Sequence, residues 1–159
     1  MVTQAGTSVF AAKKIEIHIR PAGDSATDLA VTVEEAIYNS PGKPPLTIDS
    51  AQLLGTVDAK HELTINDLQL HQSGFKLWGK GSLSLDDERR IQGLVKAETD
   101  NVGRLLTVLD PYIELPDQDR TTLKLVLSLF GKKAKADLVA REGQLFIGPV
   151  RVGELLPLY

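Results

Sequence analysis

The chain has no cysteine, and among its 159 residues there are only three histidines, one tryptophan, three tyrosines and four phenylalanines. Without cysteine there is no disulfide framework, no thiolate zinc site and no thiol nucleophile. The few aromatic residues leave little for base stacking, and a net charge of −3 argues against a nucleic-acid-binding face. No apolar run approaches the roughly 18 residues of a membrane-spanning helix, and no signal peptide is visible at the start.

Aliphatic residues are abundant instead, with 24 leucines, 12 valines and 9 isoleucines. This content excludes a disordered tail, and the length fits a single domain over residues 1–159. A chain of this size buries about 68–70% of its unfolded surface, enough for a core without metals or disulfides.

Alternation of apolar and polar residues is the dominant pattern. In residues 14–20 three isoleucines share one face and charged or polar groups share the other, and residues 28–34 repeat this design after a turn-like stretch. Such a strand–turn–strand unit predicts an antiparallel hairpin with one solvated face. Two further hairpins are expected at 75–85 with 91–97 and at 135–140 with 144–148, and a proline-rich loop at 39–45.

In two places the spacing of apolar residues changes from that of a strand to that of a helix. Leucines at 105, 106 and 109 follow Val102 at helical spacing, which predicts a helix near 101–110, capped by Asp100 or Asn101. A second stripe predicts a helix near 117–130, although alternating leucines at 123–129 leave a strand open as the alternative. The expected fold is therefore α+β: a strongly curved antiparallel sheet built from hairpins, with two helices packed on one face or end.

Reactive side chains do not converge. His18, His61 and His71 lie on separate segments and show no metal-ligand spacing. The acidic stretch 86–88 is typical of a solvated turn, and the Gly79–Lys80–Gly81 stretch lies within a strand rather than before a helix, as a phosphate loop requires. We therefore expect no catalytic residue, no metal and no cofactor.

The aliphatic excess suggests another kind of site, because a hydrocarbon ligand needs apolar area and few directional groups. The alternative is that the same side chains only form the core beneath the two helices. Trp78 alternates away from them, beside two lysines, as a packing residue or as an interfacial anchor. The candidate ligand-binding residues are Leu53, Val57, Trp78, Leu83, Leu85, Val95 and Ile147.

Two stretches carry a resemblance to known families. The phrase LWGKGSLSLD at 77–86, with IQGLV at 91–95 and VGRLL at 102–106, resembles a strand–hairpin–helix unit of AsmA-like bacterial envelope proteins. The ending REGQLFIGPVRVGELLP at 141–157 is similar to the C-terminus of the uncharacterised domain-of-unknown-function family 2125. Together these stretches cover about half of the chain.

The resemblance implies a periplasmic, non-enzymatic protein anchored in the inner membrane, of which this chain is the C-terminal portion and Met1 need not be the native start. It also implies lipid handling, so the expected partner is a lipid or a membrane protein, with no nucleic acid. A different class of function stays open, namely an assembly module that pairs through an edge strand with a membrane partner or with itself. The oligomeric state is not predicted.

Overall fold

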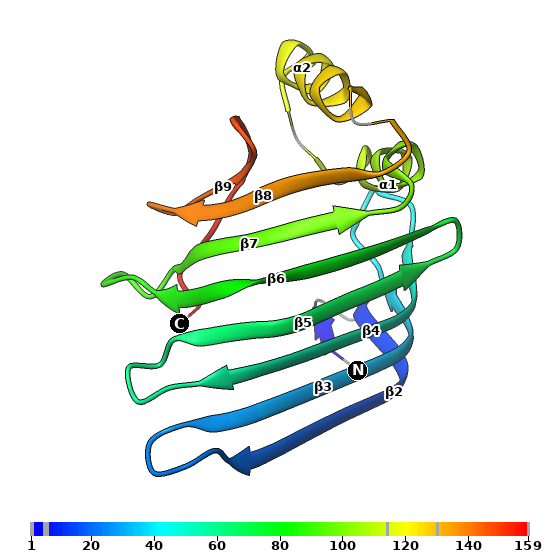
Figure 1. Cartoon of the computed structure of the whole chain (residues 1–159). Helices are drawn as coiled ribbons and strands as arrows, with labels where there is room; N and C mark the ends of the chain where they lie inside the picture. Colours follow the sequence, from blue (N-terminus) through cyan, green and yellow to red (C-terminus); the bar gives the residue numbers. More distant parts are fainter. Residues whose placement is uncertain (1, 5–6, 114, 130, 159) are drawn as a thin grey trace.

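The structure, a computed structural model, describes residues 2–4, 7–113, 115–129 and 131–158. Within these residues the chain forms one antiparallel sheet whose ten strands lie side by side in sequence order, with two helices inserted between the seventh and eighth (Figure 1). The strands are β1 (Val2–Gln4), β2 (Thr7–Pro21), β3 (Thr27–Tyr38), β4 (Leu46–Val57), β5 (Leu63–Gln72), β6 (Phe75–Leu85), β7 (Ile91–Thr99), β8 (Ala134–Arg141), β9 (Gln144–Ile147) and β10 (Val150–Glu154).

The prediction of a mainly antiparallel sheet with two helices is confirmed. The three expected hairpins correspond to the pairs β2–β3, β6–β7 and β8–β9, and the expected loop at 39–45 separates β3 from β4. The sheet is larger than the three predicted hairpins. These pairs are parts of one continuous antiparallel meander, to which β4, β5 and β10 also belong. In Figure 1 the sheet bends, so that β1 and the segment after β9 lie behind the central strands.

The two helices are α1 (Val102–Leu109) and α2 (Asp117–Ser128). They confirm the helical prediction at 117–128 and exclude the strand alternative for 121–128, whereas residue 129 lies in a turn and residue 130 lies outside the described residues. Asn101 is the cap residue of α1, and its side chain accepts a hydrogen bond from the Arg104 backbone N–H at 3.1 Å. This bond satisfies a free donor of the first turn. The helix ends at Leu109, and the cap residue Asp110 keeps helical dihedrals although it precedes Pro111, which lacks the backbone N–H that would continue the helix.

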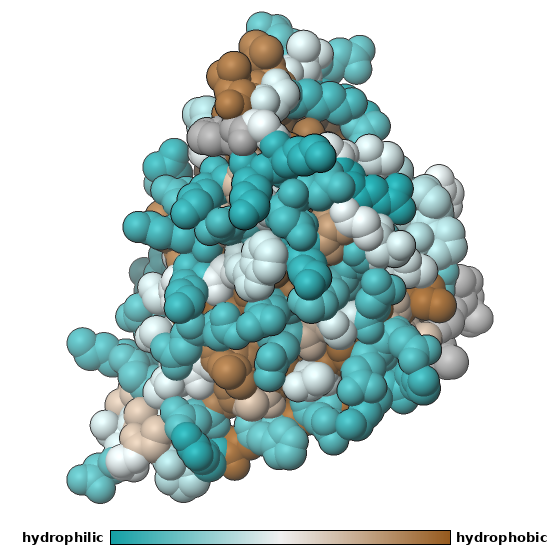
Figure 2. Space-filling view, turned by 45° about the vertical axis from the view of Figure 1, so that its right-hand side comes forward, coloured by the Kyte–Doolittle hydropathy of each residue, from teal (hydrophilic) through white to brown (hydrophobic). Residues whose placement is uncertain are grey.

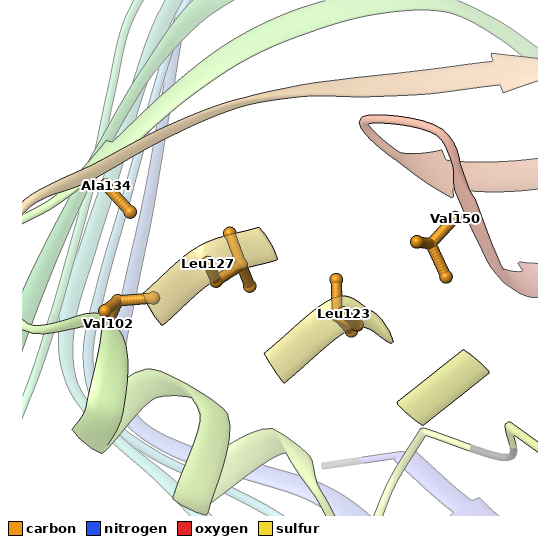
Figure 3. Close-up of a cluster of buried hydrophobic side chains, with 5 residues drawn as sticks. All are labelled: Val102, Leu123, Leu127, Ala134 and Val150. Atoms are coloured by element: carbon orange, nitrogen blue, oxygen red, sulfur yellow. The ribbon is translucent and has the colours of Figure 1, made fainter. Parts of the chain in front are cut away.

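The helices pack on one side of the sheet. Leu123 and Leu127 of α2 are 3% and 6% exposed, and they form a buried cluster with Val102 of α1, Ala134 of β8 and Val150 of β10 (Figure 3). Within the described residues this is the cluster that joins the helices to the sheet. The helix layer therefore covers the sheet only toward its C-terminal strands.

Candidate functional site

The cross-strand register gathers aliphatic side chains onto one side of the sheet. Because successive residues of a strand point to opposite sides, residues that pair directly across neighbouring strands share a side. One such row starts at Ile17 and another at Ile19 of β2, and both continue through every strand to β8. We call this side the apolar face, and its large members are Ile15, Ile17, Ile19, Leu29, Val31, Val33, Leu53, Val57, Leu63, Ile65, Leu68, Leu70, Leu77, Leu83, Leu85, Ile91, Val95, Leu138, Leu145 and Ile147.

An irregularity in β5 keeps these rows together. Ile65 pairs with Gly81 and Leu68 pairs with Gly79, so two residues, Asn66 and Asp67, lie between apolar positions that would otherwise be separated by one. A bulge of this kind inserts an extra residue without moving the rest of the strand to the other side. It explains why the alternation in β5 looks loose in the sequence.

The apolar face is covered unevenly. At the β2 edge Ile15, Ile17 and Ile19 are 52%, 60% and 69% exposed, whereas Ile65 in the centre is 3% exposed and Val95 is 7% exposed. The large members from β3 and β4 are half-buried. Three neighbouring isoleucines exposed on one side of a strand are unusual for the surface of a soluble protein. They mark a surface that another apolar group can cover.

Beneath the helices the same face forms a cleft of about 230 Å³. Its walls are almost entirely aliphatic, because α1 and α2 contribute leucines and the sheet contributes leucine, isoleucine and alanine. The walls include Leu77, Ala97, Leu105, Leu106, Leu109, Ile113, Leu123, Leu127, Ala136, Leu138, Leu145 and Ile147.

The segment between the helices is tied to the loop between β3 and β4. The Tyr112 hydroxyl donates a hydrogen bond to the backbone carbonyl of Pro44, and its ring lies against that of Tyr38, with centroids 6.4 Å apart. These contacts connect the helix layer to the N-terminal half of the sheet.

Six of the seven predicted ligand-binding residues lie on the apolar face. Ile147 borders the cleft beneath the helices, and Val95 is buried. Leu53, Val57 and Leu83 are half-buried on the part of the sheet away from the helix cluster, and Leu85 is 38% exposed at the end of β6. The helices therefore do not account for all of these positions, although Val95 and Ile147 fit the alternative of a core residue.

The structure does not bring Trp78 together with the other six. Trp78 pairs with Gln69 and Glu98, on the side opposite Leu77, and it is half-buried there. This side carries most charged strand residues, and the hydrophilic surface that dominates Figure 2 belongs to it. The exposed isoleucines of β2 were missed as site residues, because alternation shows which side a residue faces but not what covers it.

Ion pairs and hydrogen bonds organise the polar side and the turns. Asp28 accepts hydrogen bonds from Arg20 Nε at 2.9 Å and from the Thr56 hydroxyl at 3.0 Å. The hydrogen bond from Arg20, followed by that from Thr56, lowers the pKa of Asp28 below its ordinary value. These groups tie β2, β3 and β4 together, and none of them lies on the apolar face.

The acidic turn between β6 and β7 is held by Arg90. The Asp86 carboxylate accepts from the backbone N–H and from Nε of Arg90, both at 2.8 Å. Desolvation opposes ionisation of Asp86, but the hydrogen bonds and charge of Arg90 outweigh it, so the pKa of Asp86 is lowered. The structure thus gives this turn a structural role.

The lowered pKa of Asp86 predicts an effect of pH on stability. The ionised form is favoured in the folded chain, so its contribution is present above the unfolded pKa of about 3.9 and is lost as pH falls through the lower folded pKa. We expect Asp86→Asn to lower the urea midpoint at neutral pH, and the difference from wild type to shrink in acid. Asp87→Asn, in the same turn, is the control. An unchanged difference across this pH range would contradict the assignment.

The described residues contain no group of three or more His, Asp or Glu side chains placed to hold a metal ion. His18 and His61 are exposed and His71 is half-buried on separate strands or turns. None of the helices in the described part of the chain is both long enough and apolar enough to span a bilayer.

Comparison with known protein families shows a match over most of the chain. The family described as "Uncharacterized protein conserved in bacteria (DUF2125)" matches residues 51–155, which is about two thirds of the chain and runs from β4 to the end of β10. No curated protein and no solved structure matches. The matched region includes the cleft and both helices but not the exposed isoleucines of β2. The chain belongs to this family of uncharacterised bacterial proteins.

Proposed function

We propose that the chain is a non-catalytic protein of the bacterial cell envelope that holds lipid acyl chains on its apolar face. The observation that carries the proposal is the continuous set of aliphatic rows from β2 to β9, part of which is open at Ile15, Ile17 and Ile19. The other half of that face leads into the cleft beneath the helices.

The chemistry of the face suits hydrocarbon. Along the rows that start at Ile17 and Ile19, the cross-strand partners on the apolar face through β8 are aliphatic residues and glycines. Covering such area gains about 25 cal/mol per Å² and demands no directional partner. A polar or charged ligand would instead lose its hydration without compensating hydrogen bonds.

The proposed cellular setting rests on the sequence resemblance. Residues 77–106 resemble a unit of AsmA-like envelope proteins. From this resemblance we propose that the chain lies in the periplasm, as the C-terminal portion of a protein anchored to the inner membrane. The proposal assigns it no cofactor.

Binding of a fluorescent fatty-acyl probe tests this function. We expect saturable binding to the wild-type chain, and a loss of about tenfold in affinity for Ile17→Lys, because a lysine there places a charge in the path of the hydrocarbon. Ile17 is 60% exposed, so the variant should fold.

The matched control is His18→Lys, which introduces the same side chain at the next residue, exposed on the opposite side of β2. This variant should bind the probe like wild type. Equal losses for both variants, or no binding by the wild-type chain, would overturn the proposal.

A second candidate is an assembly module, and the edge of β2 favours it. Within the described residues β1 pairs only with residues 7–10 of β2, so residues 11–21 have a neighbouring strand on one side alone. Free backbone groups along an edge can pair with another strand. Light scattering distinguishes the two, since a dimer that Ile17→Lys dissociates would favour assembly over acyl binding.

A further inference from the structure

Two leucines lie exposed on the outer side of α2. Leu125 and Leu129 are 61% and 78% exposed and are one helical turn apart, while Leu123 and Leu127 of the same helix are buried. Figure 2 shows the corresponding hydrophobic surface at the top of the molecule, over α2. The core of this chain therefore does not explain these two leucines.

Two lysines follow three and four residues after Leu129 in the chain. Lys132 and Lys133 are exposed in the turn between α2 and β8, and neither has an ion pair within the described residues. The last turn of α2 contains no basic residue, and Lys132 and Lys133 lie after the end of the helix. Their neighbours Lys124 and Lys135 are already paired, with Asp110 at 3.3 Å and with Glu98 at 3.2 Å.

The backbone holds this turn in place. The N–H of Gly131 donates to the carbonyl of Ser128 at 3.1 Å, and the carbonyl of Lys132 accepts from the N–H of Val102 at 3.0 Å. The leucines and the lysines thus belong to one fixed end of the helix layer. We call Leu125, Leu129, Lys132 and Lys133 the α2 tip.

We propose that the α2 tip docks on the surface of an anionic phospholipid bilayer. Leucines that enter the boundary of the acyl chains, with lysines at the level of the phosphates, are the two contributions that bind amphipathic segments to membranes. A second copy of this chain fits less well, because a symmetric contact would bring the lysines of both copies together.

Docking through the α2 tip would also determine where the cleft beneath the helices lies relative to the bilayer. The inner side of α2, through Leu123 and Leu127, lines the cleft beneath the helices. A tip on the bilayer would therefore hold that cleft near lipid, and this consequence rests on the proposed acyl-binding function. The docking itself does not require it.

Co-sedimentation with vesicles tests the docking. We expect the wild-type chain to bind phosphatidylcholine vesicles that contain phosphatidylglycerol, and to bind pure phosphatidylcholine vesicles more weakly. Leu125→Gln with Leu129→Gln should reduce binding about tenfold or more. Lys132→Glu with Lys133→Glu should reduce binding to the anionic vesicles at least about fivefold per lysine at low salt. At high salt this difference from wild type should disappear, because salt screens the charges.

Matched controls distinguish docking through the α2 tip from nonspecific binding to vesicles. Leu156→Gln with Leu158→Gln removes leucines that are 79% and 57% exposed outside α2, and Lys60→Glu with Lys80→Glu reverses two exposed lysines elsewhere. Both controls should bind like wild type. Absence of wild-type binding, or equal losses in the controls, would overturn the proposal, as would a dimer that dissociates in the leucine variant.

The two proposals can fail separately. The leucine variant should still bind the soluble acyl probe, because Leu125 and Leu129 do not line the cleft. Conversely, Ile17→Lys should still sediment with anionic vesicles, because β2 is not part of the α2 tip.

Discussion

Replacing Gly81 by alanine is expected to destabilise the folded chain by about 3 kcal/mol, at the upper end of the usual cost of overpacking. A Cβ atom at Gly81 would lie 2.0 Å from the carbonyl oxygen of Leu94 and 2.7 Å from Cα of Val95. Both atoms belong to the backbone of β7, so no side-chain rotation relieves the clash. The two strands would have to move apart at the centre of the apolar face.

Urea unfolding measures this effect, and Gly153→Ala is the control. Gly153 lies in β10, and a Cβ there would meet nothing within 4 Å. The control should leave the unfolding midpoint almost unchanged. Similar midpoints for the two variants would show that β6 and β7 do not approach each other as the structure describes.

Replacing Leu123 by alanine is expected to cost about 3 kcal/mol of unfolding free energy. The side chain is 3% exposed and packs in the cluster that joins α2 to α1, β8 and β10. Its truncation removes apolar contacts and leaves a cavity next to the cleft beneath the helices.

Leu125→Ala in the same helix is the control for this variant. The Leu125 side chain is 61% exposed, so its truncation should change stability by less than about 0.5 kcal/mol. Equal costs at the two positions, measured by urea unfolding, would mean that α2 does not pack through Leu123.

Strands and helices could be predicted where one period was unambiguous. In β2 the isoleucines at 15, 17 and 19 alternate with charged or polar residues, and in α1 the leucine spacing agrees with a cap at Asn101. In α2 the leucines fit both periods, and the packing of Leu123 and Leu127 against β8 and β10 agrees with the predicted helix. The bulge at Asn66 and Asp67 interrupts the alternation of β5, so a fixed period of two residues does not predict it.

The candidate site was predictable only as a side of the sheet. Alternation placed Leu53, Leu83 and Ile147 together and Trp78 opposite, and the register agrees. The degree of covering depends on where the helix layer ends, which is a property of tertiary packing rather than of local pattern. For this reason the sequence pattern around Ile17 is that of a core residue, whereas its side chain is 60% exposed in the structure.

Native mass spectrometry of the gently purified chain shows whether the apolar face carries acyl chains. We expect masses above that of the polypeptide which match bound lipid, and a lower bound fraction for Ile17→Lys than for His18→Lys. A wild-type chain that repeatedly shows only its own mass, and that takes up no fluorescent acyl probe, would rule out acyl binding by this face.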